Sequence, residues 1–283
     1  TAKSQRLARH IKEPFVHCHP DTAAQYRIQD QGLVEIRSQW GSVLVRAEIT
    51  PRQRRGELFI PLHWNDQFSA RARIDAVVNP HVDPLSGQPE YKHTPVSIQP
   101  VEHDWHGFML SRNEYDISEL QYWSKLREQD NWRYEFSDNR NHDLAWLKKR
   151  VQNGHDYEWV QYHDEFDGSD RYLWFDEQGL QGCLFTAPVY EHLPARDWLS
   201  DQFTELTFEP AQRLRLLAAT SGADRPDPGP VVCSCFNVGK NTILDFIRTN
   251  SPKDVDGISQ QLKAGSNCGS CKPELKCLMS ECN

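Results

Sequence analysis

Long apolar runs are missing from this chain, and so is a recognisable targeting segment. No stretch approaches the roughly 20 apolar residues that a membrane-spanning helix needs, and the mean hydropathy is -0.73. The opening residues, TAKSQRLARH, contain no initiator Met and do not look like a signal peptide. The sequence therefore predicts a soluble cytoplasmic protein without a membrane partner.

Cysteine is scarce in most of the chain and concentrated at its end. Only Cys18 and Cys183 precede residue 230, whereas the other six of the 8 cysteines lie after it. A disulfide framework would suit a short secreted domain, so a metal site explains this concentration better. Cys183 lies in the apolar, strand-like segment QGCLFTAP and is expected to be buried.

Four of these cysteines form two tight pairs. Cys233 and Cys235 occur in VVCSC, and Cys268 and Cys271 occur in AGSNCGSC. Four soft thiolates select either zinc or an iron-sulfur cluster. Zinc sites usually space paired ligands two to four residues apart, so the tighter C-x-C pair favours a cluster while zinc stays an alternative.

The segment between the two pairs has apolar residues at helical spacing. Ile243 and Ile247 indicate one helix, and Ser251 followed by Pro252 indicates the start of another. Gly265 can end this second helix just before the second cysteine pair. Residues 231–283 therefore predict a small all-alpha domain whose loops hold the metal.

Charge is distributed unevenly along the chain. Lys and Arg minus Asp and Glu give +3 for residues 1–100, -12 for 101–230 and +1 for 231–283. The acidic middle part argues against nucleic acid, and a solvated surface is its simplest interpretation. Residues 221–230, SGADRPDPGP, contain three prolines and two glycines and predict a linker.

The region before the linker divides near residue 101. In residues 1–101, alternating apolar positions indicate strands, and Gly41 can close a hairpin between two of them, which predicts a small barrel of mixed strands. Residues 102–220 predict an alpha+beta spacer, with a helix over 142–151 and strands near 157–162, 171–175 and 180–185. No nucleophile, base and orienting group stand out together, so no catalytic residue is assigned.

Residues 231–283 resemble the domain of bacterioferritin-associated ferredoxin, and AGSNCGSC is close to the second cysteine pair of that family. The resemblance implies a 2Fe-2S cluster. Cys277 and Cys282 fall outside the family pattern and are interpreted as ordinary thiols of the tail. The implied cluster ligands are Cys233, Cys235, Cys268 and Cys271.

The N-terminal part resembles the C-terminal molybdopterin-dinucleotide-binding domain of the molybdenum oxidoreductases, through HCHPDTAAQYRIQDQGLVEIRSQWGSVLVRAEIT, GELFIPLHW and DPLSGQPEYKHTPVSI. That resemblance implies a double-psi beta barrel. The order of the parts resembles the C-terminal part of an assimilatory nitrate reductase catalytic subunit, although residues 102–220 support this only through pieces such as LPARDWLSDQF.

Three residues correspond to family contacts with bis-molybdopterin guanine dinucleotide. Trp64 in PLHW matches a position at which an indole face can pack on a guanine or pterin ring. Lys92 in PEYK matches a lysine suited to the cofactor phosphates, and Lys3 in TAKS lies next to the pterin cradle. Related enzymes often have an asparagine where this chain has Ala72, so one polar contact is expected to be absent.

The family also implies groups outside this chain. Its molybdenum-ligating cysteine and a 4Fe-4S cluster belong to the start of the subunit, so the chain is expected to be a C-terminal fragment that does not reduce nitrate alone. The implied partner is an FAD-containing, NAD(P)H-dependent electron-transfer protein, and the implied substrate is nitrate. Two alternatives stay open, another molybdopterin oxidoreductase of the formate dehydrogenase type and a non-catalytic ferredoxin-like or zinc-binding docking module.

Overall fold

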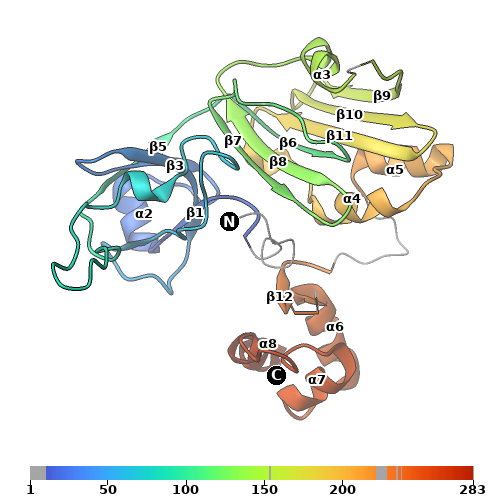
Figure 1. The fold of residues 1–283 in the computed structure, drawn as a ribbon. Coiled ribbons are helices and arrows are strands. Elements are labelled where there is room, and N and C mark those ends of the chain that lie inside the picture. The colour runs from blue at the N-terminus through green and yellow to red at the C-terminus, as the bar shows by residue number, and fades with distance from the viewer. Residues whose placement is uncertain (1–10, 153, 221–227, 234, 237, 283) are drawn as a thin grey trace. The chain divides into compact units, whose positions relative to one another are not determined.

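The computed structural model describes residues 11–152, 154–220, 228–233, 235–236 and 238–282 (Figure 1). Its contacts divide the chain into two compact units, Thr1–Ala219 and Thr220–Asn283. Most of the expected linker, residues 221–227, lies outside the described residues. Within the described ranges, no helix combines the length and apolar character needed to cross a bilayer.

The first unit begins with a five-stranded mixed sheet in the order β4-β1-β3-β2-β5. β1 pairs in parallel with β3, and the other pairings are antiparallel. The expected hairpin around Gly41 is confirmed, because β2 pairs with β3 across this turn. The described pairings do not themselves establish the double-psi barrel. The strands are β1 (Phe15–Cys18), β2 (Leu33–Arg37), β3 (Ser42–Ile49), β4 (Leu58–Phe59) and β5 (Ser97–Val101).

Helix α2 (Pro20–Tyr26) follows β1 directly. The ring of His19 caps its start by accepting a hydrogen bond from the Asp21 amide, and Pro20 occupies the first turn, where a missing N–H costs nothing. The helix ends at Arg27, which has a left-handed conformation. A short 3-10 helix, η1 (Ile74–Ala76), packs with the buried core of this sheet.

A second, six-stranded antiparallel sheet has the order β7-β8-β6-β11-β10-β9 (Figure 1). The strands expected near 157–162, 171–175 and 180–185 are confirmed as β9, β10 and β11, whereas β6, β7 and β8 were not predicted. The strands are β6 (Trp105–Ser111), β7 (Tyr122–Arg127), β8 (Trp132–Asp138), β9 (Glu158–Asp164), β10 (Ser169–Asp176) and β11 (Gly179–Ala187).

Helices cover both faces of this second sheet. Successive side chains of a strand point to opposite faces, so Met109 joins the core cluster of α3 (Leu144–Val151) while Phe108 joins that of α4 (Asp197–Asp201) and α5 (Pro210–Ala218). Cys183 lies in the same core cluster as Phe108 and is buried, as expected. The 3-10 helices η2 (Tyr190–His192) and η3 (Gln202–Thr204) complete this region.

Backbone hydrogen bonds join the segment between β4 and η1 to strand β7 of the second sheet. The Ala70 amide donates to the Trp123 carbonyl and the Lys125 amide donates to the Phe68 carbonyl, both at 2.8 Å. The first sheet ends at Val101 and the second begins at Trp105. Both sheets belong to one compact unit.

The described residues of the second unit form three helices and a small two-stranded sheet, so the all-alpha expectation is wrong in this respect. The helix expected at Ile243 is confirmed, but Ser251 ends it in a left-handed conformation instead of starting the next helix. Asp254 caps that next helix, and the helix ends before Gly265 at Lys263. The elements are β12 (Val231–Cys233), β13 (Val238–Gly239), α6 (Lys240–Asn250), α7 (Val255–Leu262) and α8 (Lys272–Cys282).

Candidate functional site

Short secondary-structure elements position the four cysteines of the second unit. Cys233 is the last residue of β12, and Cys235 follows it by two positions. Cys271 directly precedes α8, and its carbonyl accepts the Leu275 amide at 2.9 Å in the first turn of that helix. Between Cys268 and Cys271, Gly269 has a φ of +74°, a left-handed conformation that glycine adopts without strain.

The cysteines meet as two pairs, and each pair takes one member from each sequence motif. The Sγ atoms of Cys235 and Cys268 lie 3.3 Å apart. Cys233 and Cys271 are both buried in the core of the second unit, where their thiols are neighbours. The fold therefore brings together residues that are 33 positions apart in the sequence.

The two pairs have different surroundings. Cys268 is exposed and Cys235 is partly exposed, whereas Cys233 and Cys271 are only 2% and 7% exposed. The Ser270 hydroxyl lies 3.0 Å from the Cys268 Sγ atom, and with the Ser270 amide it lowers the pKa of the Cys268 thiol to about 7. Burial and the adjacent Cys233 thiol raise the pKa of Cys271 to about 11.

The donor set fits a 2Fe-2S cluster. Four cysteine thiolates are the common ligands of such clusters, and here Cys235 lies against Cys268 while Cys233 and Cys271 are neighbours in the core. Among the residues that the structure describes, no group of three or more His, Cys, Asp or Glu side chains is arranged to hold a metal ion. The thiols are thus gathered as two pairs, and their role as ligands stays a prediction.

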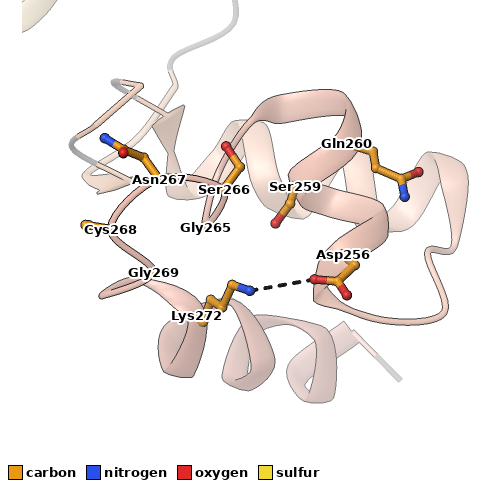
Figure 2. Close-up of a pocket in the computed structure, with 9 residues that line it drawn as sticks. All are labelled: Asp256, Ser259, Gln260, Gly265, Ser266, Asn267, Cys268, Gly269 and Lys272. Carbon is orange, nitrogen blue, oxygen red and sulfur yellow. Dashed lines mark ion pairs between the residues drawn. The ribbon is translucent and has the colours of Figure 1, made fainter.

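A polar hollow lies beside the loop that carries Cys268, whose side chain points away from the other labelled residues (Figure 2). The Lys272 ammonium and the Asp256 carboxylate face each other across it at 3.7 Å. Cys268 therefore borders a polar surface and not an apolar one. The lining residues are Asp256, Ser259, Gln260, Gly265, Ser266, Asn267, Cys268, Gly269 and Lys272.

The expected pterin contacts lie in the first unit. Trp64 is 6% exposed and packs in the core of the first sheet, and its indole N–H has no hydrogen-bond partner among the described residues. Core side chains therefore cover most of the indole, and its packing on a guanine or pterin ring stays a prediction. Ala72 is buried in the same core.

Lys92 has an exposed side chain in the loop before β5. Its amide donates to the Glu90 carboxylate at 2.8 Å, while no ion pair of its ammonium is seen among the described residues. The ammonium is therefore available to a phosphate. Lys3 lies outside the described residues.

Sequence reasoning missed Ser270 and the buried charges of the first unit. Ser270 had a visible signal, since it is a hydroxyl residue inside the C-x-x-C loop. Glu135, which is 1% exposed, forms ion pairs with Arg133 and Arg196 at 2.8 and 2.9 Å. The sequence gave no signal of these contacts, because Arg196 and Glu135 are 61 positions apart.

Two family models match parts of the chain. The molydopterin dinucleotide binding domain matches residues 1–95, and the BFD-like 2Fe-2S binding domain matches residues 231–281. The four paired cysteines all lie in the second match, and Trp64 and Lys92 lie in the first.

Several characterised proteins are similar to this chain. A nitrate reductase of Klebsiella oxytoca is 31% identical over 99% of the chain and 32% of its own length. The assimilatory nitrate reductase catalytic subunit of Bacillus subtilis is 36% identical over 36% of the chain and 14% of its own length. The F420-dependent formate dehydrogenase 1 subunit alpha of Methanococcus maripaludis is 32% identical over 36% of the chain and 14% of its own length.

The chain spans about a third or less of the length of these relatives. The match to the Klebsiella protein extends across both units, including the second sheet that neither family model covers. The chain thus contains a molybdopterin dinucleotide-binding domain and a BFD-like 2Fe-2S binding domain, and nitrate reductase homologues cover it.

Proposed function

We propose that this chain is the cofactor-binding and electron-entry part of a molybdenum-dependent assimilatory nitrate reductase. The observation that supports this most is the similarity to a nitrate reductase over 99% of the chain, together with four cysteines paired across their two motifs. The enzyme would be an oxidoreductase that reduces nitrate to nitrite in the cytoplasm.

Each unit has its own task in this proposal. Cys233, Cys235, Cys268 and Cys271 bind the 2Fe-2S cluster, which supplies one-electron transfer when bound. In the first unit, the Lys92 ammonium neutralises a phosphate of the pterin dinucleotide, and the Trp64 indole face packs on a guanine or pterin ring. An FAD-containing, NAD(P)H-dependent protein donates the electrons, which pass from the second unit toward molybdenum.

The finer assignment of domains belongs to the same proposal. We place the dinucleotide-binding domain at residues 1–101 and expect it to be a double-psi barrel, which the parallel β1–β3 pairing supports. The second sheet, within residues 102–220, would be an alpha+beta spacer. Residues 221–230 would be a linker to the 2Fe-2S domain at 231–283.

Formate dehydrogenase chemistry is the second candidate, supported by the match to the Methanococcus protein over 36% of the chain. The two activities move electrons in opposite directions. In the enzyme loaded with its cofactors, nitrate is expected to reoxidise the dithionite-reduced cluster. The EPR signal of the reduced cluster should then disappear. Reduction of the oxidised cluster by formate, with no response to nitrate, would support the second candidate instead.

Replacing Lys92 with Ala is expected to weaken retention of the pterin dinucleotide, because a phosphate loses a charged partner. A charge-assisted hydrogen bond contributes about 1.5–3 kcal/mol, so molybdenum content per subunit should fall several-fold after dialysis. Lys149→Ala, in helix α3 outside the dinucleotide-binding match, is a control with the same change of side chain. If the molybdenum content equals that of the unmodified enzyme, Lys92 is a surface residue that does not contact the cofactor.

A further inference from the structure

We propose that Cys235 and Cys268 together hold the iron that accepts the electron, and that the Ser270 hydroxyl tunes its reduction potential. This inference rests on the proposed binding of a 2Fe-2S cluster by the second unit. The inference goes further in three respects. It assigns the thiols that share an iron, it assigns the iron that is reduced, and it gives Ser270, which is not a ligand, a role in setting the reduction potential.

The pairing follows from the positions of the thiols. Two ligands of one iron must lie within a few ångströms of each other, and the Sγ atoms of Cys235 and Cys268 are 3.3 Å apart. Cys233 and Cys271 form the other pair in the core. Each iron would therefore take one thiolate from the C-x-C motif and one from the C-x-x-C motif.

The surroundings of the two pairs differ in how well they stabilise added charge. Reduction by one electron adds one negative charge, and no bond to the protein needs to form or break. An apolar interior disfavours charge, and Cys233 and Cys271 lie there beside residues such as Ile243 and Leu275. Cys268 is exposed and borders the polar hollow of Figure 2, where water and polar groups stabilise the added charge.

Ser270 reinforces this difference. Its Oγ atom lies 3.0 Å from the Cys268 Sγ atom. A thiolate ligand has no proton, so the serine hydroxyl must be the donor of this hydrogen bond. Hydrogen bonds to cluster sulfur atoms raise the reduction potential, because they stabilise the more negative, reduced state. The electron, supplied by a reduced flavin in the proposed pathway or by dithionite in vitro, would therefore reside on the iron of the exposed pair.

The first test replaces Ser270 with Ala in the full chain reconstituted with iron and sulfide. Its midpoint potential, measured by an EPR-monitored dithionite titration, is expected to shift to a more negative value. Ser280→Ala is the matched control, because the Ser280 hydroxyl donates to the Cys277 carbonyl at 2.7 Å and does not line the polar hollow. Equal potentials for Ser270→Ala and the unmodified chain would overturn the role of Ser270.

The second test replaces each cysteine of the ligand set with Ser and compares the Mössbauer spectra of the reduced clusters. Serine oxygen is a harder ligand that favours ferric iron, so it should disturb the ferrous site most when it binds the reducible iron. Cys235→Ser and Cys268→Ser should alter the ferrous doublet in the same way, whereas Cys233→Ser and Cys271→Ser should alter the ferric one.

Two outcomes of the second test would contradict the proposal. Spectra that group by motif, with Cys233→Ser matching Cys235→Ser, would overturn the pairing. A ferrous doublet altered by the buried pair would overturn the choice of iron. If a Ser variant binds no cluster, the Mössbauer spectrum of reduced Ser270→Ala decides the choice of iron, because loss of this hydrogen bond should alter the ferrous doublet. An unmodified chain that forms no 2Fe-2S cluster would refute the proposed function itself, which is a distinct result.

Discussion

Nitrate reduction driven by NAD(P)H and the flavoprotein is expected to be abolished when Cys268 is replaced with Ala in the enzyme. Reduction driven by a small artificial dye should survive. The reason is that the cluster would lie before molybdenum in the electron pathway and would take no part in the chemistry of nitrate. Cys268 is the best ligand to remove because it is exposed, so its loss leaves no cavity in the core.

Both activities should be measured on the same preparation, with Cys277→Ala as the control. Cys277 is an exposed cysteine on α8 outside the two motifs, so both activities should persist in that variant. Loss of both activities in Cys268→Ala would mean that the second unit has a structural role. Retention of both would show that electrons enter elsewhere.

Replacing Glu135 with Ala is expected to destabilise the first unit by about 3–5 kcal/mol, the usual cost of removing one partner from a buried ion pair. The carboxylate is 1% exposed and bonds to Arg133 and Arg196. Its removal leaves Arg133 with Asp197 and Glu128, but it takes away the carboxylate that pairs with Arg196. Urea unfolding followed by tryptophan fluorescence measures this unit alone, because all 9 tryptophans precede residue 199. Glu57→Ala, which breaks an exposed pair with Arg54, should cost under about 1 kcal/mol.

The same carboxylate predicts how the first unit responds to acid. Burial alone would raise the pKa of Glu135, but the charges of Arg196 and Arg133 outweigh it and place the pKa below its ordinary value of 4.5. A lowered folded-state pKa gives stability that is complete above the unfolded-state pKa and is lost as pH falls through the folded-state value. Glu135→Ala should therefore be less sensitive than the unmodified chain to acid below about pH 4.5. An equal loss of stability in both proteins would contradict this account.

The strands that could be predicted from the sequence differ from those that could not in the roles of their polar residues. β10 and β11 have continuous apolar stretches next to turn residues, and both were predicted. β8 has the sequence WRYEFSD, in which Arg133 and Glu135 resemble solvent-facing residues. They are buried because they neutralise each other and because Glu135 also bonds to Arg196, which comes from a distant segment. Pattern reading assumes that charge faces water, and this ion cluster breaks that assumption.

The candidate metal centre was easier to predict in composition than in geometry. Spacing alone indicated the four cysteines, since two close thiol pairs within one short segment are typical of metal sites. It could not show that Cys235 lies against Cys268, because they are 33 positions apart and two helices lie between them. The start of α7 shows a similar limit. Ser251 and Asp254 are both suitable caps, and only the left-handed turn at Ser251 selects Asp254.

The central claim is that the second unit binds a 2Fe-2S cluster through its two cysteine pairs. The most direct measurement is iron and acid-labile sulfide per chain, with EPR after dithionite reduction, on the full chain prepared without oxygen. The account predicts about two iron and two sulfide per chain and the signal of one reduced 2Fe-2S centre. A folded, colourless chain that contains about one zinc and no sulfide would contradict it.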